Sequence, residues 1–466
     1  MSNVRAALGT ARNHSKSLVS FNKLPDEIIA NILSLIGVDD PLDPRYDDLY
    51  PIEYKQPLHP LLGIIASSKH LRHIAINTPS LWTYVELSVE TLRDTYLEHV
   101  RRVLLYSQQL PLQVRIIGEI DDEEEKEEDV SNCLILLLGS HTHRIASLDF
   151  QIPLTCAWPV KLDLFTDISS CQIRELYTND PDAYPEQIDD TFPDRLLDGD
   201  LDVFLQSLRV IGTRGFFIPL ATTPAYRDLT VLKVMPYEFK WSQPTLVQLR
   251  NALAACPKLC SLALIECNFG TESRAPIEPV LLPDLEILDL RSLENGNELV
   301  ALMSCIDSGS SELAFSVSTD ETISANATAK LRQFITKSNV TRLCLDATVD
   351  VTDLDWLLAL PKGKNLAIRE LALCAYNFEG VEFDQPLRSG RFPSLHTLHL
   401  MECEGVDVRV CRQLLDASAI QVLRFDNPRT IVQEMFRVAP SVEHCRFSTS
   451  IAYREDNREW PVYVFH

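Results

Sequence analysis

The sequence lacks the features that mark secreted or membrane-spanning proteins. Its twelve cysteines form no CxxC pair and no Cys/His spacing typical of zinc sites, and no signal peptide precedes them. We therefore expect reduced thiols and a cytoplasmic or nuclear location, or both. The most apolar run, CLILLLG at 133–139, is far shorter than the roughly 20 residues that a membrane-spanning helix needs, so we expect no membrane partner.

Motifs of the common enzyme classes are missing as well. The chain contains no GxSxG elbow, no GxxxxGK[ST] loop, no GxGxxG fingerprint and no HExxH pair. Two histidine pairs, His141 with His143 and His396 with His399, are the nearest candidates for metal ligands, and we assign both to packing or surface. We expect a protein that is not an enzyme and that binds neither a metal nor a cofactor.

Basic residues are scarce relative to acidic ones. Against 43 Lys and Arg stand 66 Asp and Glu, a formal net charge of -23, which argues against general affinity for nucleic acid or anionic membranes. Residues 1–25 differ, because they hold Arg5, Arg12, Lys16 and Lys23 and no acid. This composition is faintly similar to a mitochondrial transit peptide, but we predict a disordered tail over 1–20.

The first structured element that the sequence predicts is a short amphipathic helix in FNKLPDEIIANILSLIG, 21–37. Pro25 suits the first helical position, and Asp26 and Glu27 suit the positive end of the helix dipole. The apolar residues form two adjacent stripes, one of Ile28, Ile32 and Leu35, the other of Ile29, Leu33 and Ile36. More than half of the helix surface therefore needs burial.

Two more short helices are predicted after a Pro- and Asp-rich loop at 38–57. One lies near 60–66, and the other places Leu71, Ile74 and Ala75 inward and stops at Thr78 and Pro79. Three short helices bury too little surface to be comfortably stable alone. The segment 21–87 therefore needs another surface, either on a partner protein or on the rest of the chain.

The LPDEII opening and the TPSLW closing of this segment resemble the F-box of fungal F-box-like proteins. In that family Leu-Pro starts the first helix, TPxLW ends the motif, and the helices dock on the Skp adaptor, and through it on a cullin, in Skp-cullin-F-box ubiquitin ligases. The resemblance covers residues 21–87 and implies adaptor binding for the matching positions, with Trp82 as the expected hot spot. These positions are Leu24, Pro25, Ile28, Ile32, Leu33, Ile65, Ile74, Pro79, Leu81 and Trp82.

The segment departs from the family pattern in its third helix. Ser67, Ser68 and Leu71 stand where the family often has Val-Cys and an aromatic residue, and the loop at 38–57 is longer than in the minimal motif. A second interpretation therefore stays open. In it the front helices cap the rest of the chain, and the protein is an interaction scaffold that recruits no ligase.

The long remainder repeats one pattern, apolar-x-x-apolar-x-apolar, at a mean spacing of 27 residues between 145 and 442. Leucine-rich repeats have units of roughly 20 to 29 residues. Helical segments such as TLVQLRNALAA separate the predicted strands, which indicates a curved solenoid of strand-helix units over 144–466. An ordinary α/β domain is the alternative. The pattern starts at 145, 173, 205, 229, 259, 285, 310, 340, 368, 395, 420 and 442.

Between these two parts, residues 88–143 are expected to form a helix, a strand and an acidic loop. The loop includes DDEEEKEED at 121–129, which we interpret as solvated, with docking of a basic partner as the alternative. Within the repeats, Cys267 and Cys403 lie at the ninth position. Leucine-rich repeats carry Asn or Cys there, turned inward to satisfy backbone groups at the strand end.

Side chains that alternate with the inward leucines should share the concave face of the solenoid. Their charges nearly balance, so they indicate no charge preference, and we assign binding of an unknown protein client to a C-terminal cluster of Arg424, His444 and Arg446. The sequence thus predicts an α/β fold, with a three-helix F-box followed by a curved leucine-rich-repeat solenoid. The expected concave positions are Lys233, Met235, Asp289, Arg291, Arg342, Asp346, Glu370, His399, Met401, Arg424, Asp426, His444 and Arg446.

Overall fold

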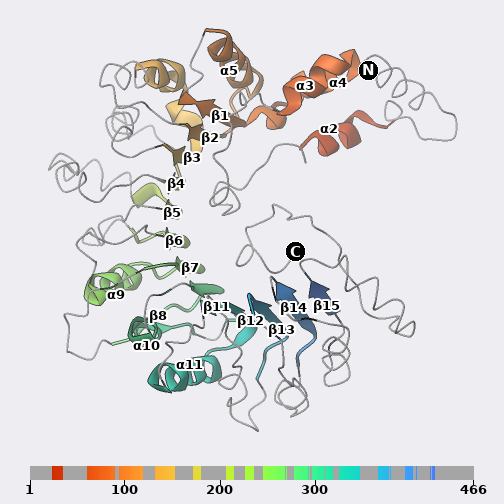
Figure 1. The fold of residues 1–466 in the computed structure, drawn as a ribbon. Helices are drawn as coiled ribbons and strands as arrows, with labels where there is room; N and C mark the ends of the chain where they lie inside the picture. The colour runs from red at the N-terminus through yellow and green to blue at the C-terminus, as the bar shows by residue number, and fades with distance from the viewer. Residues whose placement is uncertain are drawn as a thin grey trace, which may run out of the picture. The chain divides into compact units, whose positions relative to one another are not determined.

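The computed structural model shows a mixed α/β protein with a large parallel sheet (Figure 1). The chain forms two compact units, Met1–Pro181 and Asp182–His466, so the expected start of the solenoid at 144 lies within the first. The structure describes residues 24–34, 60–89, 94–118, 132–152, 172–179, 206–214, 226–235, 245–267, 278–291, 296–309, 311–318, 325–346, 366–376, 394–401 and 422–425, with the single positions 269, 293, 378, 403, 406 and 420.

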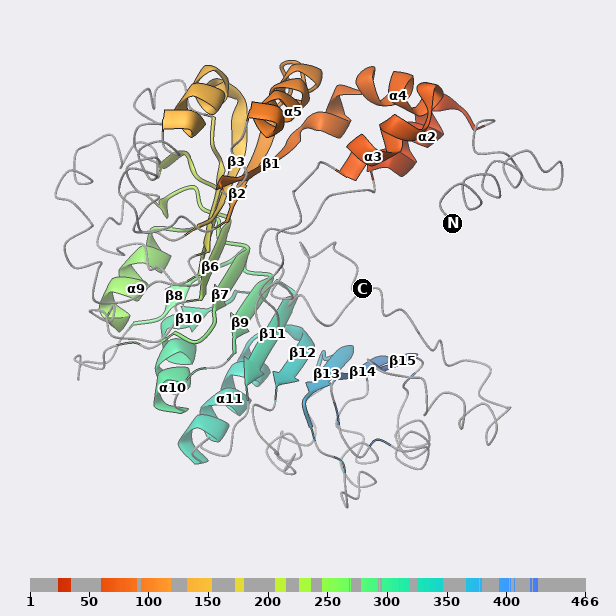
Figure 2. The ribbon, with the colours of Figure 1, turned by 45° about the horizontal axis from the view of Figure 1, so that its top comes forward.

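The first unit starts with the three expected short helices and a 3-10 turn. They are α2 (Asp26–Ser34), α3 (Pro60–Ser67), α4 (Lys69–Ile76) and η3 (Pro79–Trp82). Helix α2 begins one residue later than expected, because Pro25 lies just outside it and its carbonyl accepts the N–H groups of Ile28 and Ile29 at 3.0 and 3.1 Å. Helix α4 packs against α2, α3 and η3, as Figure 2 shows for the helices.

A parallel sheet completes the first unit, and its strands are neighbours in chain order. Its elements are β1 (Tyr84–Ser88), α5 (Asp94–Tyr106), β2 (Leu112–Ile117), a helix at 132–138, η5 (Gly139–Arg144), β3 (Ile145–Gln151) and β4 (Glu175–Asn179). The buried Arg144 ties η5 to the end of α5, since its two terminal nitrogens donate to Ser107 Oγ and the Leu104 carbonyl, each at 2.9 Å. This satisfies a carbonyl that the last helical turn leaves unpaired.

The second unit continues the same construction, with parallel strands that again pair in chain order. Helices α9, α10 and α11 lie on one side of its sheet (Figures 1 and 2). The elements are β5 (Val210–Arg214), β6 (Val231–Met235), α9 (Leu246–Ala254), β7 (Ser261–Leu264), β8 (Val280–Leu281), β9 (Ile287–Leu290), α10 (Gly296–Cys305), β10 (Ile306–Asp307), β11 (Leu313–Ser318), α11 (Ala325–Lys337), β12 (Val340–Asp346), β13 (Glu370–Cys374), β14 (Thr397–Met401) and β15 (Val422–Phe425). Strands β8 and β10 form a separate pair.

The core of the second unit is a row of large apolar side chains at matching positions of successive strands. Each is at most 3% exposed, and each is opposite its neighbours in the register. Because side chains alternate along a strand, the residues on either side of this row point to the other face of the sheet. The row consists of Leu232, Leu262, Leu288, Phe315, Leu343, Leu371 and Leu398.

Two of the predicted repeats were placed wrongly by two or three residues. Strand β5 pairs Ile211 with Leu232, so its unit starts at Leu208 and not at 205. Strand β11 pairs Phe315 with Leu288 and Leu343, which moves that unit from 310 to 312. In both windows the apolar residues can be aligned with the pattern, at least in part, at more than one offset, and only pairing with the neighbouring strand decides between the offsets.

Candidate protein-binding surfaces

Helix α2 buries one of its two apolar stripes and leaves the other at the surface. Ile29 is fully buried and Leu33 is 1% exposed, whereas Ile28 on the adjacent stripe is 45% exposed. Ile32 is half-buried. Just before the helix, Leu24 is half-buried and Pro25 is exposed. The exposed stripe is an apolar surface that a partner could cover. We call Leu24, Pro25, Ile28 and Ile32 the α2 outer stripe.

The other residues that the F-box resemblance marks as adaptor-binding lie mainly inside the first unit. Ile65, Ile74 and Leu81 are at most 9% exposed, and Pro79 is half-buried at the start of η3. With Leu33 and Trp82 they pack the helices together. The structure therefore divides the ten positions into an outer group on α2 and an inner group that holds the helical layer.

Trp82 belongs to the interior and joins the helices to the sheet region. Its side chain is fully buried, its indole N–H donates to the Ala75 carbonyl at 2.7 Å, and its ring centre lies 5.1 Å from that of Tyr106 on α5. Trp82, the last residue of η3, packs against α5, because burial of so large a ring is strongly favourable. In this arrangement Trp82 presents no surface to a partner.

The residues at which the third helix departs from the F-box pattern have identifiable positions. Ser68 caps α4, since its hydroxyl accepts the N–H of Leu71 at 3.4 Å. Ser67 is exposed and Leu71 is half-buried. His70 lies 3.6 Å from Asp26 and links α4 to α2. Helix capping therefore explains the serine at position 68 without reference to any partner.

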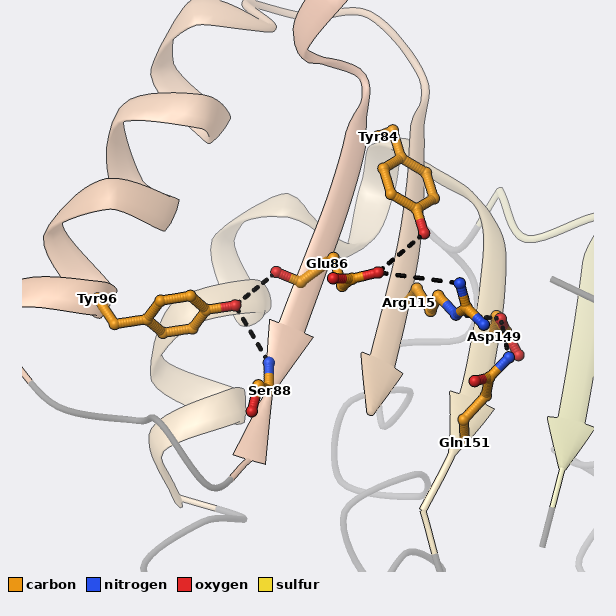
Figure 3. A network of polar contacts seen from close by, with 7 residues as sticks. All are labelled: Tyr84, Glu86, Ser88, Tyr96, Arg115, Asp149 and Gln151. Atoms are coloured by element: carbon orange, nitrogen blue, oxygen red, sulfur yellow. Dashed lines mark hydrogen bonds and ion pairs between the residues drawn. The ribbon is translucent and has the colours of Figure 1, made fainter. Parts of the chain in front are cut away.

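The sheet of the first unit carries a polar row on β1, β2 and β3 (Figure 3). Glu86, Arg115 and Asp149 are directly opposite one another in the register. Nε of Arg115 lies 3.2 Å from Asp149 Oδ2, and its Nη1 lies 3.8 Å from Glu86 Oε2. Burial acts to lower the pKa of Arg115, but the carboxylate of Asp149 raises it above its ordinary value, so the guanidinium stays charged.

Two tyrosines contact Glu86, one from β1 itself and one from α5 (Figure 3). The hydroxyl of Tyr84 donates to Glu86 Oε2 at 3.3 Å, and that of Tyr96 on α5 donates to the Glu86 carbonyl at 2.7 Å and accepts the N–H of Ser88. Burial raises the pKa of Tyr96 to about 12. Sequence reasoning missed this network, because single polar residues in LQVRII and IASLDF gain meaning only when the register places them side by side.

The second unit has a similar ion pair on the face opposite its leucine row. Arg291 Nε donates to Asp289 Oδ1 at 2.9 Å and its Nη2 to Oδ2 at 2.8 Å, and both side chains are largely buried. Burial raises the pKa of the nearby Asp346, although the guanidinium of Arg291 opposes the shift. Several of the expected concave positions do share this face. Lys233, Asp289, His399 and Arg424 are in one register row, Asp346 and Met401 are in another, and Arg342 and Glu370 are in a third.

Of the predicted client cluster, Arg424 lies on β15 opposite His399. His444 and Arg446 lie outside the described residues, as do Asp426 and the acidic run at 121–129. The client cluster therefore stays a prediction.

The prediction for Cys267 and Cys403 is confirmed. The thiol of Cys267, after β7, donates to the Val234 carbonyl of the preceding strand at 3.6 Å, and that of Cys403, after β14, donates to the Leu373 carbonyl at 3.2 Å. Both therefore satisfy a carbonyl near the end of the previous strand. Burial raises the pKa of the Cys267 thiol well above its ordinary value, so it remains protonated and able to donate.

Within the described ranges, no three or more His, Cys, Asp or Glu side chains gather as a metal site would require. None of the helices that the structure describes is both long enough and apolar enough to span a bilayer. Neither the known protein-family models nor the curated proteins contain a match to this chain.

Proposed function

We propose that the protein is a non-catalytic substrate-recognition subunit of a Skp-cullin-F-box type ubiquitin ligase. Its front helices hold the Skp adaptor, and through it a cullin, and its strand-helix array holds a protein client. The contribution to ubiquitin transfer is proximity, which raises the effective concentration of client lysines near the charged enzyme. The protein acts in the cytoplasm, the nucleus or both.

The observation that carries this proposal is the α2 outer stripe. Helix α2 is held mainly by its inner stripe, whereas the outer stripe is only partly covered and leaves Ile28 45% exposed. Complete burial of one such side chain contributes roughly 1.5 to 3 kcal/mol, so a partner that covers the stripe gains several kcal/mol. The stripe contains the Leu-Pro pair by which the segment resembles an F-box.

The array is interpreted as a leucine-rich-repeat solenoid because its described strands are parallel and pair in chain order within each unit. A doubly wound α/β sheet would reverse its strand order. The Cys267 and Cys403 hydrogen bonds, which recur after two different strands, agree with a repeating unit.

The alternative, a scaffold that recruits no ligase, has its own support in Trp82. The tilted contact of the Trp82 ring with Tyr106 shows that part of the front segment does pack on the following elements of the first unit. A helical layer that is held in this way needs no adaptor for its stability.

Capture of a purified Skp adaptor by the full chain separates the two functions. Ile28→Glu places a charge on the outer stripe without touching the core, so we expect it to weaken capture at least tenfold. Val247→Glu is the matched control, because Val247 is 41% exposed on α9 in the other unit. It should leave capture unchanged.

Equal capture by wild type and Ile28→Glu, or no capture by the well-folded wild type, would support the scaffold. Recovery of a cullin together with the adaptor from the native cells would support the ligase. For the client, reversing the charges of Arg424, His444 and Arg446 should abolish its recovery while adaptor capture persists.

A further inference from the structure

Two thiols meet on the face of the second unit that lies opposite its leucine row. Cys344 on β12 and Cys374 on β13 have their sulfurs 3.7 Å apart. Cys344 is fully buried and Cys374 is half-buried, so the pair is reached from solvent at Cys374.

A third sulfur-containing side chain packs in the same area. Met401 on β14 is directly opposite Cys374 in the register, and both pack against the buried cluster of Ala314, Cys344 and Ala372. Side chains directly opposite on neighbouring strands are within contact distance. Two thiols and a thioether from three successive strands thus share one small area of the sheet.

A disulfide does not fit this pair well. The register pairs Cys344 with Ala372 and Asp346 with Cys374, so the two cysteines are diagonal neighbours, two residues out of step. With strands about 4.8 Å apart and a rise of about 3.3 Å per residue, their Cα atoms are roughly 8 Å apart. A disulfide rarely spans more than about 7 Å without backbone movement.

A metal ion bridges such a gap without backbone movement. Two sulfurs that each bind a metal at about 2.3 Å, with trigonal or tetrahedral angles, lie roughly 3.8 to 4.0 Å apart. The observed 3.7 Å is close to this separation. We propose that Cys344, Cys374 and Met401 form a site for a soft monovalent cation, copper(I), which would tie β12, β13 and β14 together.

The chemical type of the ligand atoms, all of them sulfur, indicates which metal ion the site would bind. Thiolate and thioether sulfurs suit copper(I), which accepts two or three ligands, whereas structural zinc takes four. No His, Cys, Asp or Glu among the described residues extends the thiol pair to a group of three. The carboxylate of Asp346, opposite Cys374, is a hard donor and a poor ligand for copper(I).

Binding requires loss of both thiol protons, so one copper(I) ion releases two protons and leaves one net negative charge on the site. Because protons compete with copper(I) for both thiolates, affinity should increase with pH.

The test is an anaerobic titration of the reduced full chain with copper(I) against a chromophoric competitor ligand. We expect the Cys344→Ser/Cys374→Ser variant to bind one equivalent less than wild type, and Met401→Leu to bind that equivalent about tenfold more weakly. Cys260→Ser is the matched control, because the Cys260 thiol is also half-buried in this unit but donates to the Lys258 carbonyl. X-ray absorption should show copper bound only by sulfur.

Identical stoichiometry in wild type and the double variant would overturn the proposal. A disulfide between Cys344 and Cys374 that forms without metal under a mild disulfide oxidant, and that peptide mapping identifies, would also overturn it. Far-ultraviolet circular dichroism of each variant reports whether it folds. Adaptor capture is measured separately, so a failed copper titration leaves the proposed function untouched.

Discussion

Ile28 and Trp82 differ in what their substitution would report, although both belong to the same resemblance. Ile28 is at the surface of α2, whereas Trp82 is enclosed by Ala75 and Tyr106. A substitution of Trp82 therefore disturbs the packing of the first unit, and any effect on partner binding would follow from that disturbance. Among the ten positions of the resemblance, those of the α2 outer stripe are therefore the ones to test for binding without a change in folding.

For Trp82 we predict a large loss of stability. Trp82→Ala should lower the free energy of unfolding by about 3 to 5 kcal/mol through loss of buried surface and a cavity. Trp82→Phe keeps most of the ring but loses the hydrogen bond to Ala75, which costs about 1 kcal/mol. Urea unfolding followed by circular dichroism measures both. Ile28→Ala should change stability little, and a Trp82→Ala variant as stable as wild type would contradict the observed packing.

The partial burial of Asp346 leads us to predict a pH-dependent effect of this residue on stability. Burial raises its pKa in the folded protein above the ordinary 3.8, so the folded state prefers the protonated acid and the ionised form opposes folding. Asp346→Asn should therefore raise the free energy of unfolding at pH 7. Its advantage should shrink as the pH falls through the raised pKa and vanish below about 3.8.

Denaturant unfolding of wild type and Asp346→Asn at several pH values checks this sign. Asp284→Asn, at an exposed position, serves as the control for removal of a surface carboxylate. A difference between wild type and Asp346→Asn that stays constant with pH would show that ionisation of Asp346 is not its source.

At the scale of single elements, α9 illustrates how local sequence sets a helix boundary. Thr245 accepts the N–H of Gln248 at 3.2 Å, and the Gln248 side chain accepts the N–H of Thr245 at 2.8 Å. This reciprocal cap satisfies two N–H groups that a helix start leaves unpaired. The residue types and their spacing in TLVQ are enough to specify it.

Thr245→Ala should cost about 1 kcal/mol of stability, since it removes one of these hydrogen bonds and weakens the other. Gln333→Ala, at an exposed position inside α11, is the control and should be close to neutral. Thermal unfolding of both variants provides the comparison. If the loss of stability in the Thr245→Ala/Gln248→Ala double variant equals the sum of the losses in the two single variants, this would argue against a reciprocal cap. The two hydrogen bonds of such a cap should be coupled.

The periodicity of the sequence predicts the elements well where the pattern is strong. Helices α2, α4, α5, α9 and α11 and most strands lie where apolar spacing places them. Periodicity cannot show which stripe of α2 is covered, because the choice depends on α4 and η3. Periodicity also could not predict the row of Glu86, Arg115 and Asp149. That row depends on the register, which decides which residue of each strand lies opposite which residue of the neighbouring strand.

At the scale of the whole molecule, the chain consists of two compact units whose described strands pair mainly with their sequence neighbours. In such arrays stability is a sum of local terms and nearest-neighbour interfaces. The loss of stability caused by a substitution should therefore be confined to the neighbouring strands and helices.

We predict that Leu148→Ala in β3 and Leu288→Ala in β9 loosen different parts of the chain. Both side chains are fully buried, so each change should cost about 2 to 5 kcal/mol locally. Hydrogen exchange followed by mass spectrometry should show faster exchange mainly within the unit that carries the substitution. Equally faster exchange in both units after either change would show that the chain unfolds as one cooperative block.

Pairing in chain order also has a consequence for synthesis on the ribosome. Leu232 pairs with Leu262, and Leu343 with Leu371, so a new strand finds its partner in the segment translated just before it. Contacts of such short sequence separation form quickly, and they do not wait for the end of the chain. The sheet of each unit can therefore grow strand by strand during translation, and its newest edge is the part that most needs protection from aggregation until the next strand emerges.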